Sequence, residues 1–108
     1  AIAVGGQAST SASIQTHGNI AIGSSSGVVG GSFGGTLTTA NGGNAVAIGT
    51  AAQATGASSF AAGANAQASQ TDAVAIGNGA LTSGFYSASV GGVSRATTNG
   101  HSRIFARF

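Results

Sequence analysis

Side chains that could support catalysis, metal binding or charge recognition are rare in this chain. Its 108 residues include one acidic residue, Asp72, three basic residues, two histidines and no cysteine. Asp72 has no second carboxylate with which to share acid–base work, and His17 and His101 lie at opposite ends of the chain. Two distant histidines and one carboxylate do not make a coordination sphere. We therefore expect no enzymatic activity, no metal site and no cofactor, and we interpret Asp72 as a turn residue.

The basic residues do not form a surface for nucleic acid. Arg95, Arg103 and Arg107 all lie within the last fourteen residues, whereas nucleic-acid binding needs many phosphate contacts spread over a face. The sequence also contains no apolar run long enough to cross a bilayer. We therefore expect no nucleic-acid partner and no direct insertion of this segment into a membrane.

The elements that must position any binding residue are set by a repeat. A small apolar pentad ending in glycine, such as AVAIG, recurs at a step of fourteen residues, and its glycines are Gly35, Gly49, Gly63, Gly77 and Gly91. Residues 10–23 fit the same frame, while residues 24–35 fit it poorly and are interpreted as a shortened or looped coil. A fixed short period indicates a solenoid. Each coil holds two short strands and two tight turns, and coils stack at about 4.8 Å.

Glycine also recurs at the middle of the coil, at Gly42, Gly56 and Gly84. We expect these residues, like the glycines that close the pentads, to turn corners with a positive φ, which glycine accepts without steric cost.

Strand parity then assigns the faces. In the pentad strand, branched apolar residues alternate with small ones, so both faces are apolar and both need cover. We expect the branched residues to fill the interior and the small residues to form an interface with another copy of the chain. These predicted interface residues are Ala3, Ala21, Ala47, Ala61, Ala75 and Ser89.

The second strand of each coil presents polar residues on one side. We expect this side to face water and interpret it either as a merely solvated surface or as a binding face for an extended partner. The candidate binding residues are Thr39, Gln53 and Gln67, with Thr55, Ser69 and Ser83 beside them.

The pentads, the intervening A-x-A-x-G segments and the fourteen-residue step resemble the head repeats of trimeric autotransporter adhesins, the YadA-like group. The resemblance covers most of residues 1–91 and implies a left-handed parallel β-roll, three chains side by side, at a bacterial cell surface. Residues 89–100 are similar to the neck segment of that family at Ser89, Val90, Gly91, Arg95, Thr98 and Asn99, and depart from it at Thr97 and Gly100.

The C-terminal segment, residues 92–108, carries the most distinctive cluster of side chains. Its members are Arg95, Asn99, Arg103, Phe105, Arg107 and Phe108. As a strand, the sequence RIFARF covers the open edge of the last coil. The alternative is that it docks into a neighbouring subunit and joins chains head to tail.

Three functions compete on these observations. The first is an extracellular adhesin head that attaches to a matrix protein or a glycan, as a homotrimer. The second is a structural subunit of a surface or viral fibre, joined through residues 101–108. The third is ice binding, which a regular threonine ladder would favour, but the outward positions mix Ser, Thr, Gln, Asn and Leu.

Overall fold

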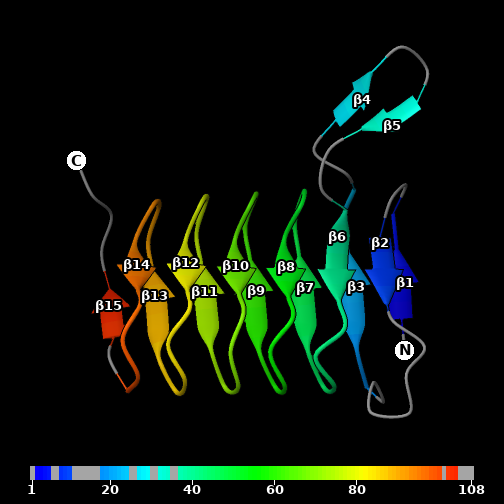
Figure 1. Cartoon of the computed structure of the whole chain (residues 1–108). Helices are drawn as coiled ribbons and strands as arrows, with labels where there is room; N and C mark the ends of the chain where they lie inside the picture. The colour runs from blue at the N-terminus through cyan, green and yellow to red at the C-terminus, as the bar shows by residue number, and fades with distance from the viewer. Residues whose placement is uncertain are drawn as a thin grey trace.

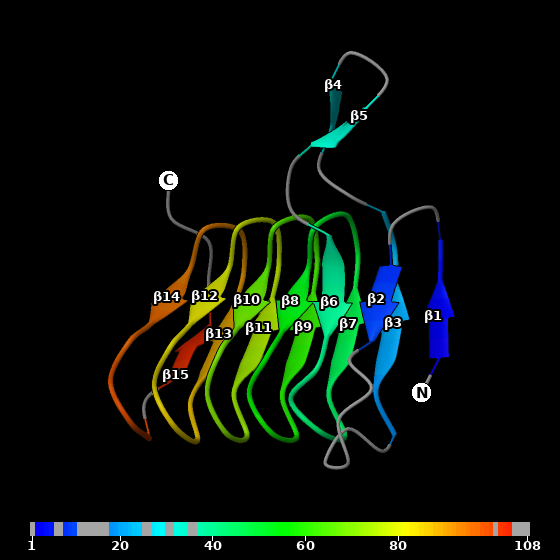
Figure 2. The same cartoon turned by 45° about the vertical axis from the view of Figure 1, so that its right-hand side comes forward.

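The chain is built entirely from short β-strands in the part that its computed structural model describes, residues 2–5, 8–10, 18–24, 27–29, 32–34, 37–100 and 102–104. The strands are two or three residues long, because a corner follows each of them almost at once. They assemble into two facing parallel sheets that the chain visits alternately, which makes a β-solenoid (Figures 1 and 2). The predicted solenoid is confirmed.

Sheet A contains the pentad strands. Its seven strands pair in parallel in the order β1 (Ile2–Val4), β3 (Ile20–Ile22), β7 (Val46–Ile48), β9 (Phe60–Ala62), β11 (Val74–Ile76), β13 (Ala88–Val90) and β15 (Ser102–Ile104).

Sheet B contains the polar strands. Its six parallel strands follow the order β14 (Arg95–Ala96), β12 (Leu81–Thr82), β10 (Gln67–Ala68), β8 (Gln53–Ala54), β6 (Thr38–Ala40) and β2 (Ala8–Thr10). From β7 onward, paired residues in sheet A are fourteen positions apart, as in Val46, Phe60 and Val74. The strict period therefore produces a strict register, in which each side chain stacks on its equivalent in the next coil.

Two insertions interrupt the period near the N-terminus. Ile2 pairs with Ile20, eighteen positions on, and Ile20 pairs with Val46, twenty-six positions on. The first coil is thus four residues longer than fourteen, and the second is twelve longer. The longer insertion contains β4 (Gly27–Val29) and β5 (Ser32–Gly34), which pair with each other in antiparallel fashion (Figure 1). Of the segment 24–35, interpreted as a shortened or looped coil, residues 27–29 and 32–34 therefore lie outside the two sheets of the roll, while Ser24 still accepts a hydrogen bond from the Ala51 N–H at 2.9 Å.

The predicted frame for residues 10–23 places the pentad strand where β3 lies but misplaces the polar strand. The strand that pairs with β6 is Ala8–Thr10, whereas the frame assigned that position to residues 12–14, which lie outside the described residues. The pentad that ends at Gly35 is not a coil strand either, because its residues 32–34 belong to the antiparallel pair. Small residues recur so often in this sequence that the fourteen-residue frame could be extended over segments that do not form coils.

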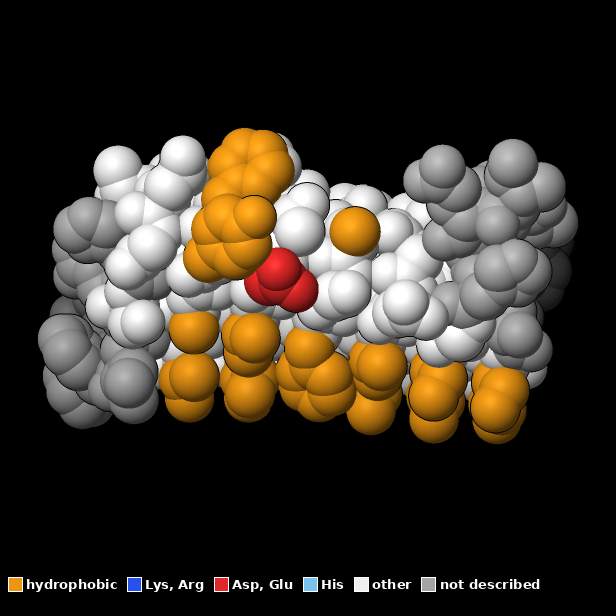
Figure 3. All heavy atoms as spheres, turned by 90° about the horizontal axis from the view of Figure 1, so that it is seen from below, with side chains coloured by type: hydrophobic (Ala, Val, Ile, Leu, Met, Phe, Trp, Pro, Cys, Tyr) orange, Lys and Arg blue, Asp and Glu red, His pale blue; other side chains and the backbone are white. Residues whose placement is uncertain are grey.

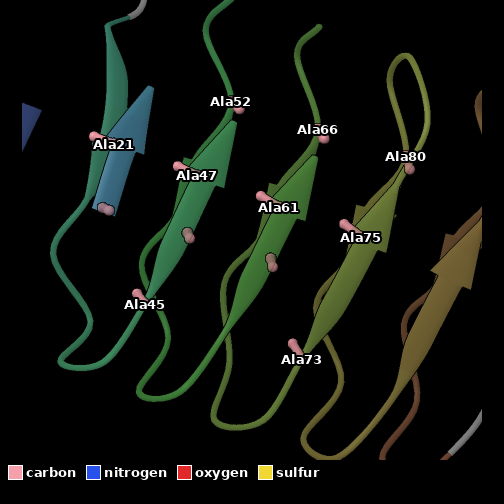
Figure 4. Close-up of a cluster of buried hydrophobic side chains, with 12 residues drawn as sticks. Ala21, Ala45, Ala47, Ala52, Ala61, Ala66, Ala73, Ala75 and Ala80 are labelled. Carbon is pink, nitrogen blue, oxygen red and sulfur yellow. The ribbon is translucent and has the colours of Figure 1, made fainter. Parts of the chain in front are cut away.

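Alanine makes up most of the interior, together with a few serine, threonine and asparagine side chains. Fourteen apolar residues are buried among those described, and every one is alanine. Their methyl groups lie between the two sheets in stacked rows (Figure 4). Since a methyl group is short, the two sheets approach closely, and the smallest extent of the molecule is 15 Å.

The glycines at the corners are required by close approach as well as by φ. Gly63 has a φ of 128°, and a Cβ added there would lie 2.6 Å from the carbonyl oxygen of Gly77 in the next coil. Gly42, Gly56 and Gly84 do not have a positive φ, so the expected reason for them is wrong. An added Cβ at any of the three would instead overlap the backbone of the following coil.

Candidate functional site: two outward faces of the roll

The alanine stripe of sheet A lies inside the roll. Ala21, Ala47, Ala61, Ala75 and Ser89 are each 0% exposed in the single chain, and Ala3, on the edge strand β1, is exposed. The expectation that this stripe forms the interface between copies is therefore wrong for the five buried residues. The physical reason is size, since nearly all side chains buried between these closely spaced sheets are those of alanine, serine or threonine.

The branched residues of the same strands point outward. Exposed members include Ile22, Ile48 and Ile76, at 38–39%, and Ile2 and Val4, at 54%. In the space-filling view they form a continuous row along one side of the molecule (Figure 3). We call this surface the apolar face; its residues are Ile2, Val4, Ile20, Ile22, Val46, Ile48, Phe60, Ala62, Val74, Ile76, Ala88 and Val90.

The two rows of the apolar face complement each other in side-chain size at β9. One row runs Val46, Phe60, Val74, and the other runs Ile48, Ala62, Ile76. The largest residue, Phe60, therefore shares its coil with the smallest, Ala62. Sequence parity had separated these residues correctly from the alanines, but it could not tell which set faced inward.

The polar residues of sheet B point outward, as predicted. Thr39, Gln53, Gln67, Leu81 and Arg95 stack in register on successive strands, and their inward neighbours are buried. We call the row of Thr39, Gln53 and Gln67, with the flanking Thr55, Ser69 and Ser83, the polar face. All six of these side chains are half-buried or exposed.

One corner row uses the left-handed backbone conformation in every regular coil. Asn44, Ser58, Asp72 and Tyr86 occupy equivalent positions with φ between 55° and 56°. The Asp72 N–H donates to the carbonyl oxygen of Ala57 at 2.8 Å. These bonds place Asp72 in a turn, in agreement with its predicted role.

Sequence reasoning overlooked an aromatic pair at this corner. Phe85 is 41% exposed and Tyr86 is 67% exposed, with ring centroids 6.4 Å apart. The available signal was that Tyr86 stands where the equivalent positions hold Asn, Ser and Asp, residues that adopt positive φ more readily than tyrosine.

The C-terminal strands continue both sheets. The solenoid extends beyond the predicted boundary at residue 91, because β14 pairs with β12 and β15 pairs with β13. Arg95 is exposed on β14, and Asn99 accepts a hydrogen bond from the Phe85 N–H at 3.0 Å. Arg103 lies on β15, where only its backbone is described, and Phe105, Arg107, Phe108, His17 and His101 lie outside the described residues.

The described residues contain no group of three or more His, Cys, Asp or Glu side chains that could hold a metal ion. In that same part of the chain, no helix is long and apolar enough to span a membrane.

Comparison with known proteins decides what kind of roll this is. The family described as the YadA head domain repeat matches residues 35–52, 40–66 and 54–80. Residues 35–80 are YadA head repeats. They span β6 to β11, the regular coils. Searches of curated proteins and of solved structures gave no match.

The family match confirms the resemblance drawn from the pentads and their spacing. YadA head repeats are non-enzymatic adhesin modules of trimeric autotransporters, whose heads in general form homotrimers displayed on the bacterial cell surface. Of the two outward faces, the apolar face is the one that needs cover in such an assembly.

Proposed function

We propose that this chain is the non-catalytic head module of a surface adhesin, assembled as a homotrimer through its apolar face. The observation that carries the proposal is the continuous row of exposed and half-buried apolar side chains on sheet A (Figure 3). Large contiguous apolar patches on a soluble surface mark interaction sites. The occupant is a second and a third copy of the same chain, in line with the homotrimers of the YadA family.

Cyclic symmetry suits the geometry of the apolar face. A rotation axis parallel to the solenoid axis brings equal coils to equal heights, so each row meets the corresponding level of its neighbour. Burial of an exposed Val or Ile contributes about 25 cal/mol for each Å² removed from water. Six strands contribute to the face, so the gain accumulates along the whole length of the roll.

The polar face is the proposed attachment surface. In a trimer joined through sheet A, sheet B looks outward on every subunit. Gln53 and Gln67 stack at neighbouring heights and present amide donors and acceptors about 4.8 Å apart. An uncharged row of this kind suits an extended partner, such as a matrix protein or a glycan, at the outside of a bacterial cell.

The mass of the native particle tests the assembly. Light scattering on the 108-residue chain is expected to give three times the chain mass of 10.0 kDa, with discrete particles in electron micrographs. A folded monomer contradicts the proposal. Long filaments favour a structural fibre subunit in its place.

A matched pair of variants identifies the face that assembles. Ile48→Asp places a charge on the apolar face, and Gln53→Asp places the same charge on the opposite side of the roll. We expect Ile48→Asp to yield monomers, because a carboxylate is costly to bury in an apolar interface, and Gln53→Asp to remain trimeric. If the two variants have the same oligomeric state, the assignment of the apolar face as the interface is contradicted.

Attachment is tested separately from assembly. The trimer is applied to surfaces coated with matrix proteins and to arrays of glycans, and the double variant Gln53→Ala/Gln67→Ala is compared with it. We expect the variant to stay trimeric and to bind less. Gln70→Ala, which removes a half-buried glutamine at a corner, serves as the control and should bind as the wild type does.

A further inference from the structure

Three asparagines in the described coils are followed directly by glycine, at Asn41, Asn78 and Asn99. This pair is the one most prone to spontaneous deamidation, because glycine has no side chain to shield its backbone nitrogen and leaves the backbone free to rotate. All three asparagines are exposed. Sequence alone therefore ranks them as equals, and the structure separates them.

In deamidation, the backbone nitrogen of the following glycine attacks the asparagine side chain. In two of the three pairs, this N–H group is held by a hydrogen bond. The Gly79 N–H donates to the carbonyl oxygen of Ala64 at 2.8 Å, and the Gly100 N–H donates to that of Phe85 at 2.7 Å. Each bond must open before the nitrogen can lose its proton and turn toward the asparagine side chain. The Asn99 side chain is held as well, because its Oδ1 accepts from the Phe85 N–H at 3.0 Å.

In the third pair, the Asn41 N–H is bonded to the Ala54 carbonyl oxygen at 3.2 Å, but the attacking Gly42 amide has no such bond to the described residues. The equivalent amides of Gly56 and Gly84 each donate to the next coil at 3.3 Å. In addition, Gly42 is followed by Gly43, so this corner holds two consecutive residues without side chains.

From these contacts we infer that Asn41 is a site of spontaneous deamidation in the folded protein, while Asn78 and Asn99 are protected. The Gly42 nitrogen gives its proton to solvent base and forms a bond to the Asn41 Cγ. The Cγ–Nδ2 bond breaks, and ammonia leaves with a proton from water. One water molecule then opens the cyclic imide, which yields aspartate or isoaspartate without any oxidant or reductant.

The modification changes the polar face. Asn41 is equivalent to Thr55, Ser69 and Ser83, since each of the four donates its N–H to the coil that follows. Deamidation therefore adds a carboxylate at the edge of the polar face, in a chain that otherwise carries a single acidic residue. The isoaspartate product also lengthens the backbone beside Gly42, where an added Cβ would already overlap the carbonyl oxygen of Gly56.

Incubation of the full 108-residue chain at mildly alkaline pH tests the inference. Peptide mapping by mass spectrometry measures conversion at each asparagine in the folded protein and in the same protein held in denaturant. In the folded protein, we expect Asn41 to convert roughly tenfold faster than Asn78 or Asn99, the factor for opening about one hydrogen bond. In denaturant, the three rates should become similar.

Two variants provide the controls. Asn41→Ser introduces the residue that stands at the equivalent positions 69 and 83, so it suits the fold, and it should remove the main acidic species. Asn78→Ser should leave that species in place. The inference is overturned if Asn78 or Asn99 converts as fast as Asn41 in the folded chain. It is equally overturned if Asn41 stays intact when folded and converts only in denaturant.

Discussion

The two sides of a single strand in sheet A differ in the size of their side chains and in how far these are exposed. In β7, Ala47 is fully buried while Ile48, the next residue, is 39% exposed. The ordinary rule places the larger apolar side chain inside. Here the smaller one is inside, because a two-sheet roll with three-residue strands has room mainly for small side chains such as those of alanine, serine and threonine. The larger residues are left for contact with another molecule.

Substitutions on the buried side of the sheet-A strands are expected to cause the largest loss of stability. Ala75→Leu adds three carbons where the side chain is fully buried, and overpacking of this kind costs about 1–3 kcal/mol or more. We expect at least about 3 kcal/mol of lost stability in urea unfolding, or no folded protein. Ile76→Leu, one residue away on the apolar face, is the control and should cost less than about 1.5 kcal/mol.

Substitutions of the corner glycines are expected to cause the next largest loss of stability. Gly63→Ala combines an unfavourable φ of 128° with a Cβ only 2.6 Å from the Gly77 carbonyl oxygen. We expect a loss of about 2–3 kcal/mol in the free energy of unfolding. Asn65→Gly, at a φ of 60° in the next corner, should change it by less than about 1 kcal/mol. Similar losses in both variants would show that the corners are not tightly stacked.

A buried hydroxyl pair gives the smallest and sharpest comparison. The Thr82 Oγ1 donates to the Val74 carbonyl oxygen at 2.6 Å, so the Ser89 hydroxyl, 2.7 Å away, must donate to Thr82. Thr82→Ala leaves Ser89 without this acceptor and should cost about 1–3 kcal/mol. The preceding coil has Ala68 and Ala75 at these positions.

The double variant Thr82→Ala/Ser89→Ala copies that preceding coil. It should therefore recover part of the loss, and a double-mutant cycle of the unfolding free energies measures the coupling. Strict additivity of the two single substitutions would show that the hydroxyl pair makes no net contribution.

Much of this fold could be predicted from the sequence, because a fourteen-residue step and alternating residue size define strands, corners and parity. What parity could not supply was the distance between the sheets, and so Ala47 and Ile48 were assigned to the wrong sides. The frame also failed at residues 10–23, because Ala12 and Ile14 suit a strand as well as Ala8 and Thr10 do. Only pairing with β6 distinguishes them.

The polar face was predicted more securely. Thr39, Gln53 and Gln67 were placed toward water because they are polar and alternate with small residues along their strands. By contrast, the amide that protects Asn78 could not be foreseen, because its partner lies in another coil. Contacts between coils depend on exact stacking heights, which composition does not encode.

The direction of the hydrogen bonds has a mechanical consequence. Most of the backbone hydrogen bonds run from coil to coil, along the axis of the roll, so tension between the two ends of the solenoid pulls each of these bonds along its own length. Coils then detach one after another from the ends. Each detached coil of fourteen residues pays out about 40–45 Å of chain, because an extended residue spans about 3.4 Å while a stacked coil occupies about 4.8 Å. A single roll under tension therefore lengthens in steps, by one coil at a time.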